Sequence, residues 1–175
     1  MSLIGLASET VGTINALRSE LTGNISTELA GFLQDANRFL LKHIQMINNT
    51  PLQVYCSGLA FSPTDSIIRR IFNNQRPSWM PVLPQVKKSW SAELQTLEGH
   101  FNWDSNVSSD NAHVKHGQGP HISVEHSWVC FGGEKVLWLP HEFRGRVCHA
   151  IKHDTLAMGY TNGRVLIIRL STPFG

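Results

Sequence analysis

Apolar residues recur at helical spacing in the first half of the chain. Val11, Ile14, Leu17 and Leu21 follow one another at steps of three and four residues. Gly23 comes where a left-handed C-terminal cap would fall. This pattern predicts a short first helix that ends near Gly23.

A longer apolar stripe follows between Ile25 and Ile47. Its members are Ile25, Leu29, Phe32, Leu33, Ala36, Leu40, Ile44 and Ile47. Polar residues are expected on the opposite helical face, namely Gln34, Asp35, Arg38 and Lys42. Asn24 is placed to cap the start, and Thr50-Pro51 ends the helix because proline disfavours helical structure in the preceding residue.

A further helix start is predicted at Ser62-Pro63. The hydroxyl can accept a backbone N–H, and proline occupies the first helical position without losing a hydrogen bond. The apolar residues that would then form a buried face are Ile67, Ile68, Ile71 and Phe72.

Prolines interrupt the chain after these helices. Pro77, Pro81 and Pro84 exclude a continuous helix or a central strand in this stretch. We expect an extended connector, with Trp79 and Trp90 held against neighbouring surfaces. The last two prolines also match a minimal polyproline-II motif, but a stiff connector is the simpler interpretation.

From His121 onward the pattern changes to short strands. The strand-like runs are Ile122–Val124, Trp128–Phe131, Lys135–Leu139, Val147–Ile151, Thr155–Gly159 and Arg164–Leu170. Gly132-Gly133 provides a turn between the second and third runs, and Thr161-Asn162-Gly163 joins the last two. Asn-Gly between apolar strands is the strongest local hairpin signal, because both residues tolerate positive φ.

A repeat motif begins but does not finish at Leu94–His100. In WD-type propellers a repeat of about 40–45 residues opens with Gly-His, closes with Trp-Asp and forms one four-stranded blade. Gly99 and His100 supply the opening pair and Trp103 follows, but the polar stretch from Asn102 to Gly119 lacks the alternation of blade strands. The segment WSAELQTLEGH resembles the propeller entry of fungal NACHT/WD-repeat proteins of the heterokaryon-incompatibility-like class.

The same resemblance extends to other segments. PLQVYCSGLAFSPTDSIIRRIF, from Pro51 to Phe72, looks like the helical segment that precedes the propeller in that family. ISVEHSWVCFGGEKVLWLP and TLAMGYTNGRVLIIRL look like its terminal blades. The resemblance covers residues 25–170 and implies a truncated C-terminal part with degenerate WD repeats. It also implies recognition of a protein or a surface.

These patterns predict an α+β fold: N-terminal helices, as a helical pre-propeller segment, and then an antiparallel β-meander that resembles one or two incomplete β-propeller blades. The expected division is a helical segment at 1–75, a Pro-rich connector leading to a WD-repeat-like start at 76–100, a polar loop at 101–120 and the β-meander at 121–175. A closed propeller needs about four to eight blades. The helices or another chain must therefore cover the open sheet.

Composition indicates a globular protein and argues against several partners. The chain has 175 residues, of which 41% are hydrophobic and 16% charged, enough for one sizeable core or two small ones. The net charge of +2 comes from scattered Lys and Arg without a basic stripe, so nucleic acid is not an expected partner. No run approaches the roughly 20 apolar residues of a membrane span and no secretory signal is evident, so we expect no membrane insertion and a cytoplasmic location.

The residues that could carry catalysis or bind a nucleotide do not form a recognised motif. The run from Gly132 to Val136 does not match a phosphate-binding loop, so neither nucleotide binding nor the NACHT ATPase of the family is expected in this chain. Cys56, Cys130 and Cys148 are odd in number and widely spaced, which suits reduced thiols. We expect no enzyme activity and no cofactor.

Nine histidines leave a metal-binding alternative open. His149 and His153 have the spacing of a ligand pair, but they are predicted to span a strand end and a turn. Ordinary histidines are therefore favoured, and no metal site is assigned. The other candidate ligands are Cys130, Cys148, His113, His116 and His121.

We therefore expect a non-catalytic protein-interaction module, a truncated relative of the WD-repeat sensing end of fungal NACHT-type proteins. The alternatives are a small His/Cys metal-binding protein and a degenerate remnant without a selected function. The expected partner is another protein, or a second copy that associates through an open sheet edge. Trp103, Arg144 and Arg146 are the candidate partner-binding residues, because Trp and Arg are enriched at interfaces. Trp128 and Trp138 are expected in the core.

Overall fold

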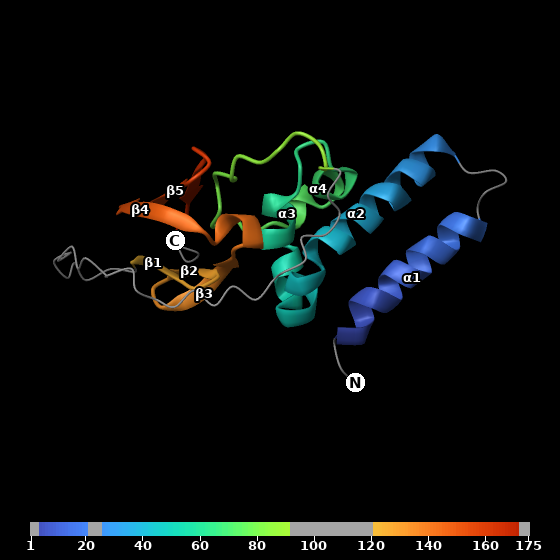
Figure 1. Cartoon of the computed structure of the whole chain (residues 1–175), viewed down its shortest axis with the longest axis horizontal. Coiled ribbons are helices and arrows are strands. Elements are labelled where there is room, and N and C mark those ends of the chain that lie inside the picture. Colours follow the sequence, from blue (N-terminus) through green and yellow to red (C-terminus); the bar gives the residue numbers. More distant parts are fainter. Residues whose placement is uncertain (1–3, 21–25, 92–120, 172–175) are drawn as a thin grey trace.

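Helices form the N-terminal half of the protein and two small sheets form its C-terminal part (Figure 1). The computed structural model describes residues 4–20, 26–91 and 121–171. The helices are α1 (Ile4–Glu20), α2 (Thr27–Asn49), α3 (Ser57–Phe61) and α4 (Ile67–Ile71), and the 3₁₀ turns are η1 (Pro51–Val54), η2 (Asn73–Gln75) and η3 (His141–Phe143). The strands are β1 (Ile122–Glu125), β2 (Trp128–Phe131), β3 (Glu134–Trp138), β4 (Arg146–Lys152), β5 (Thr155–Tyr160) and β6 (Val165–Arg169). This order confirms the predicted α+β class.

The long helix α2 begins at Thr27, two residues after the start that a cap at Asn24 would give. Ser26 caps it, since the Ser26 hydroxyl accepts the N–H of Leu29 at 3.3 Å. The predicted cap at Asn24 is therefore wrong. The predicted end is confirmed, because Thr50 is the C-cap. Helix α1 lies beside α2, with only Val11 and Ile14 half-buried among residues 8–20 (Figure 1).

The polar face predicted for α2 is wrong at Asp35, which is buried. One carboxylate oxygen accepts hydrogen bonds from the Ser66 hydroxyl and the Ile68 N–H, both at 2.8 Å. The other oxygen accepts the indole N–H of Trp90 at 2.6 Å. Asp35 is buried because it holds the start of α4, a segment distant in sequence.

The predicted helix start at Ser62-Pro63 is also wrong. Ser62 is the C-cap of α3 with an extended backbone, as expected for a residue before proline. Helix α4 begins later, at Ile67, and its N-cap is Ser66, whose hydroxyl accepts the N–H of Arg69 at 3.2 Å.

The described part of the proline-rich connector, residues 76–91, is not helical and turns once, where the Met80 N–H donates to the Pro77 carbonyl. It makes one isolated bridge, from Val82 to Arg169, and the Trp79 carbonyl accepts the N–H of Ser171 at 2.7 Å. The connector therefore lies along the β6 edge of the second sheet. Trp79 packs against the cluster between the sheets, and Trp90 packs against the helical cluster.

The strands form two antiparallel meanders, β1-β2-β3 and β4-β5-β6, and both sheets are open. Gly132 and Gly133 turn the chain between β2 and β3 with positive φ, as predicted. Between β5 and β6 only Gly163 has a positive φ, while the Asn162 side chain accepts the N–H of Arg164 at 3.1 Å. The predicted hairpin is present, but its Asn-Gly pair does not place both residues in the left-handed region.

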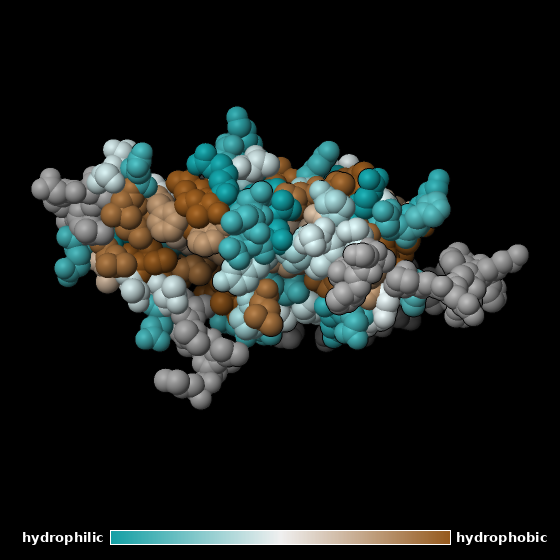
Figure 2. Space-filling view, turned by 180° about the vertical axis from the view of Figure 1, so that it is seen from behind, coloured by the Kyte–Doolittle hydropathy of each residue, from teal (hydrophilic) through white to brown (hydrophobic). Residues whose placement is uncertain are grey.

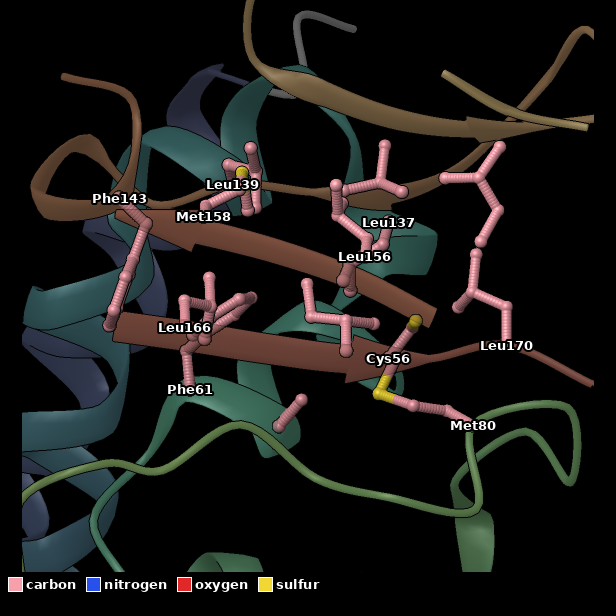
Figure 3. Close-up of a cluster of buried hydrophobic side chains, with 14 residues drawn as sticks. Cys56, Phe61, Met80, Leu137, Leu139, Phe143, Leu156, Met158, Leu166 and Leu170 are labelled. Carbon is pink, nitrogen blue, oxygen red and sulfur yellow. The ribbon is translucent and has the colours of Figure 1, made fainter. Parts of the chain in front are cut away.

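The main core lies where the two sheets meet (Figure 3). Leu137 and Leu139, from β3 and the residue after it, pack with Leu156 and Met158 of β5. Phe61 of α3 joins this cluster and packs against Phe143, with ring centroids 4.8 Å apart and ring planes tilted by 37°. The other members are Cys56, Ala60, Met80, Ile122, Val129, Leu166, Ile168 and Leu170.

A second, smaller cluster holds the helices together. Ala36 and Phe39 of α2 pack with Leu59 of α3 and Ile68 of α4. Gly58 permits this close approach, since an added Cβ would lie 3.1 Å from both Met46 and Phe39 side-chain atoms. Helix α3 thus contributes Leu59 to the helical cluster and Phe61 to the sheet cluster.

Candidate interaction surface

The sheet β4-β5-β6 has one buried and one exposed apolar face. Leu166 and Ile168 of β6 point into the core. Because successive side chains on a strand point to opposite faces, Val165 and Ile167 point outward. Their side chains are 58% and 49% exposed. Strand β6 therefore carries apolar side chains on both faces, with Arg169 at the end of the outward one, and the described residues cover only the inward face.

Small side chains continue this outer face across β5 and β4. The register pairs Ile167 with Ala157, Ala157 with Ala150, and Gly159 with Cys148. An added Cβ at Gly159 would lie 2.9 Å from the Cys148 sulfur, so the backbone and the thiol are closely packed there. The outer face (Cys148, Ala150, Ala157, Gly159, Val165 and Ile167) carries small and apolar side chains, and Lys152, Thr155 and Arg169 form its border in the next row of the register. Its shape suits packing of a second flat layer at the usual sheet spacing of about 10 Å.

Side chains from the N-terminal half bind the edge of β3 that is not paired with β2. The Gln53 amide donates to the Val136 carbonyl at 3.2 Å and accepts the N–H of Trp138 at 3.1 Å. The Ser57 hydroxyl donates to the Trp138 carbonyl at 2.5 Å. Gln53 thus makes the pair of bonds that a neighbouring strand would make.

The edge strand β4 differs from the other edges. The β6 edge carries the Val82 bridge, and on β1 the Val124 carbonyl accepts a bond from the Arg146 guanidinium at 3.4 Å. Within the described residues, β4 pairs only with β5, and every residue of β4 after Arg146 is exposed.

The predicted partner-binding residues have different positions. Arg144 lies 4.4 Å from the centroid of the Trp138 ring, and its Nε donates to the Leu139 carbonyl at 2.9 Å. Arg146 bonds to Val124, so both arginines are half-buried and contact their own chain. Trp103 and the motif residues Gly99 and His100 lie outside the described residues, and their predicted roles stay predictions.

Basic groups gather at the start of β4. The guanidinium of Arg164 lies 4.9 Å from the centroid of the Phe143 ring, and the Tyr160 hydroxyl donates to the Phe143 carbonyl at 3.0 Å. Burial raises the pKa of Tyr160 to about 12, although the charges of Arg146 and Arg164 oppose this rise. Tyr160 therefore stays a neutral hydrogen-bond donor at neutral pH.

The sequence predicted association through an open sheet edge, but it identified neither β4 as that edge nor the outer face as a binding surface. A signal was present, because Val165, Leu166, Ile167 and Ile168 are four consecutive apolar residues. Such a run is typical of a strand covered on both faces. The exposure of β4 had no comparable signal, because pairing partners are set by the fold.

The thiols and histidines do not form a site in the described part of the chain. Burial raises the pKa of Cys56 to about 12, and burial also raises the pKa of Cys130. Cys148 is exposed on β4. His149 lies in β4 and His153 in the following turn, as predicted. No three His, Cys, Asp or Glu side chains come together among the described residues.

An apolar area also covers the helical end of the molecule, at the left of the view in Figure 2. Among the described helical residues, Leu17 of α1 and Leu29 of α2 are exposed apolar side chains. No described helix is long and apolar enough to cross a bilayer.

Comparison with known proteins gives one significant relative among curated proteins. The vegetative incompatibility protein HET-E-1 of Podospora anserina is 39% identical over 100 residues, which is 57% of this chain. The match spans only 7% of that relative's length. No family model matches the chain, and no solved structure matches it significantly. The similarity to HET-E-1 supports a relation to the fungal NACHT/WD-repeat proteins that the sequence resembles.

Proposed function

We propose that this chain is a non-catalytic protein-interaction module that uses the outer face of the β4-β5-β6 sheet. The observation that carries the proposal is β6, whose Val165 and Ile167 are apolar and exposed while Leu166 and Ile168 fill the core. Exposed apolar side chains gathered on one sheet mark a surface that another protein covers. Similarity to a vegetative incompatibility protein supports recognition in preference to catalysis.

We also propose that the chain is related specifically to the WD-repeat region of such proteins. The two open sheets act as incomplete blades of a truncated WD-repeat region, and a partner supplies the missing layer. The helical segment 1–75, the connector 76–100, the loop 101–120 and the β-meander 121–175 are the proposed units. Trp103, Arg144 and Arg146 are proposed to contribute to partner binding, and the protein is proposed to be cytoplasmic.

The test replaces an outer-face residue with a charged one. Ile167→Lys places an ammonium group in the proposed contact, while Leu52→Lys makes the same kind of change at a residue that is 84% exposed on η1. Both variants and the unaltered chain are used to capture partners from an extract of the organism that makes the protein. We expect Ile167→Lys to reduce the captured partner by at least about tenfold and Leu52→Lys to leave it unchanged.

Light scattering at several concentrations separates a second copy from another protein. A dimer that Ile167→Lys dissociates would identify the partner as a second copy. Equal capture by both variants, together with a monomer at every concentration, would contradict a binding role for this face.

A further inference from the structure

We propose that the free edge of β4 binds an extended acidic strand of another protein. This inference rests on the proposed function and names the chemistry of the partner. A free strand edge presents unpaired backbone N–H and C=O groups that an extended peptide can use for pairing. The seven residues of β4 pair only with β5 within the described chain.

The contrast with the other edges supports β4 as the binding edge. Gln53 and Ser57 bind the β3 edge, and Val82 bridges to β6. The chain thus uses side chains or backbone from its N-terminal half on both of these edges. On β4, Val147 and Ile151 are instead 63% and 41% exposed.

Charge complementarity identifies the partner strand as acidic. Strand β4 carries Arg146, His149 and Lys152 and no carboxylate. The nearest acidic residue in sequence, Asp154, lies 3.9 Å from the Arg169 guanidinium. Opposite charges across paired strands stabilise the pairing. The best complement is a strand of about seven residues with acidic residues near both ends and small apolar residues between.

The same charges argue against a second copy of this chain. Antiparallel pairing of two β4 strands about His149 would place Arg146 opposite Lys152 of the other copy. Other registers would also bring only basic or neutral side chains together, because β4 contains no acidic residue. Like charges directly opposite one another destabilise a strand pair.

The test uses three synthetic heptapeptides with the full chain. The first has Glu at both ends and alternating Val and Thr between them. The second has Lys in place of Glu, and the third is the acidic peptide with alternate backbone amides methylated. Binding is measured by fluorescence anisotropy, and the β4 amides are followed by hydrogen exchange.

We expect the acidic peptide to bind and to protect the amides from Val147 to Ile151. The basic and methylated peptides should bind at least about tenfold more weakly. Lys152→Glu should weaken binding of the acidic peptide about tenfold, whereas Lys87→Glu, the same change on the distant connector, should not. Added salt should weaken the charge contribution.

Three results with the peptides would overturn the inference: no binding at millimolar acidic peptide, equal binding of the methylated peptide, or binding without protection of β4. Binding of an oligonucleotide at the same amides in preference to the acidic peptide would also overturn it. Loss of captured partner in Ile167→Lys alongside a negative peptide result would leave the outer-face proposal standing and remove only the inference about the edge.

Discussion

His43 is a buried histidine that the structure holds in its neutral form. The Ser62 hydroxyl donates its only hydrogen to the Gly58 carbonyl at 2.7 Å. The 3.2 Å contact between His43 Nε2 and Ser62 Oγ therefore requires the imidazole to donate. Burial lowers the pKa of His43 from 6.5 to about 4, while Glu142 opposes the shift and Lys42 adds to it.

This histidine predicts a loss of stability in mild acid. The unfolded chain binds the proton with a pKa near 6.5 and the folded chain with a pKa of about 4. The stabilising contribution is therefore complete above pH 6.5 and is lost as the pH falls toward 4. We expect the free energy of unfolding to fall by about 2 kcal/mol from this group between about pH 7 and pH 5, as measured by urea unfolding.

The control for this prediction removes the titrating group. His43→Gln should flatten the decline in unfolding free energy over the same pH range, whatever its stability at neutral pH. His149→Gln, at an exposed position on β4, is the matched change. Glu142 contributes in the same direction at lower pH, because its bond to Lys42 and the Lys42 charge outweigh burial and lower its pKa. An unchanged decline in His43→Gln would contradict the role assigned to His43.

The burial of Asp35 shows a feature that the local sequence pattern does not reveal. Its spacing in α2 predicted a polar, exposed position, and that prediction was wrong. Asp35 is buried because the N–H of Ile68, the Ser66 hydroxyl and the Trp90 indole all donate to it. These three donors come from segments 31 to 55 residues away, and local periodicity does not contain that information.

At the scale of elements, the β3 edge shows how a helical turn can take the place of a strand. Gln53 both donates to and accepts from the backbone of β3, at Val136 and Trp138. This pair of bonds joins the end of η1 to the sheet. It also prevents β3 from pairing with other chains.

Removal of the Gln53 side chain should therefore destabilise the protein and expose the edge of β3. We expect Gln53→Ala to lower the free energy of unfolding by about 1–2 kcal/mol, because two backbone groups lose their partners. Urea unfolding measures the loss, and hydrogen exchange at the Trp138 amide should become faster. Gln85→Ala, at an exposed position on the connector, should change stability by less than about 0.5 kcal/mol. Equal effects of the two substitutions would refute the bonding role.

The strands were predictable from the sequence because the signals were local. Runs of apolar residues between turn residues gave all six strands to within two residues at either end. The helix starts at Thr27 and Ile67 were not predicted, because several nearby hydroxyl and amide side chains compete for the cap. Ser26 and Ser66 are the caps, and Ser66 is also held by Asp35. Two hairpins turn at His126 and His153, which have positive φ. These turns were not predicted, because neither position is a glycine.

At the scale of the whole molecule, the general class was predictable and the contact surface was not. The predicted relation to fungal NACHT/WD-repeat proteins agrees with the similarity to HET-E-1. The exposed β4 edge and the outer face depend on how two meanders and a connector pack. Such packing follows from contacts over long sequence distances, for which one sequence has no direct pattern.

Helix α3 joins the helical cluster to the sheet cluster, and this predicts cooperative unfolding. Phe61 packs on Phe143 between the sheets, while Leu59, two residues earlier, packs among α2 and α4. We expect Phe61→Ala to cost about 3–5 kcal/mol and the milder Phe61→Leu about 1 kcal/mol. Hydrogen exchange should become faster in both 27–49 and 155–169, because loss of the sheet contact also releases α3 from α2.

Phe72→Ala, at an exposed phenylalanine, is the matched control and should leave both regions unchanged. Faster exchange confined to 155–169 would show instead that the segments 1–75 and 121–175 unfold as independent units.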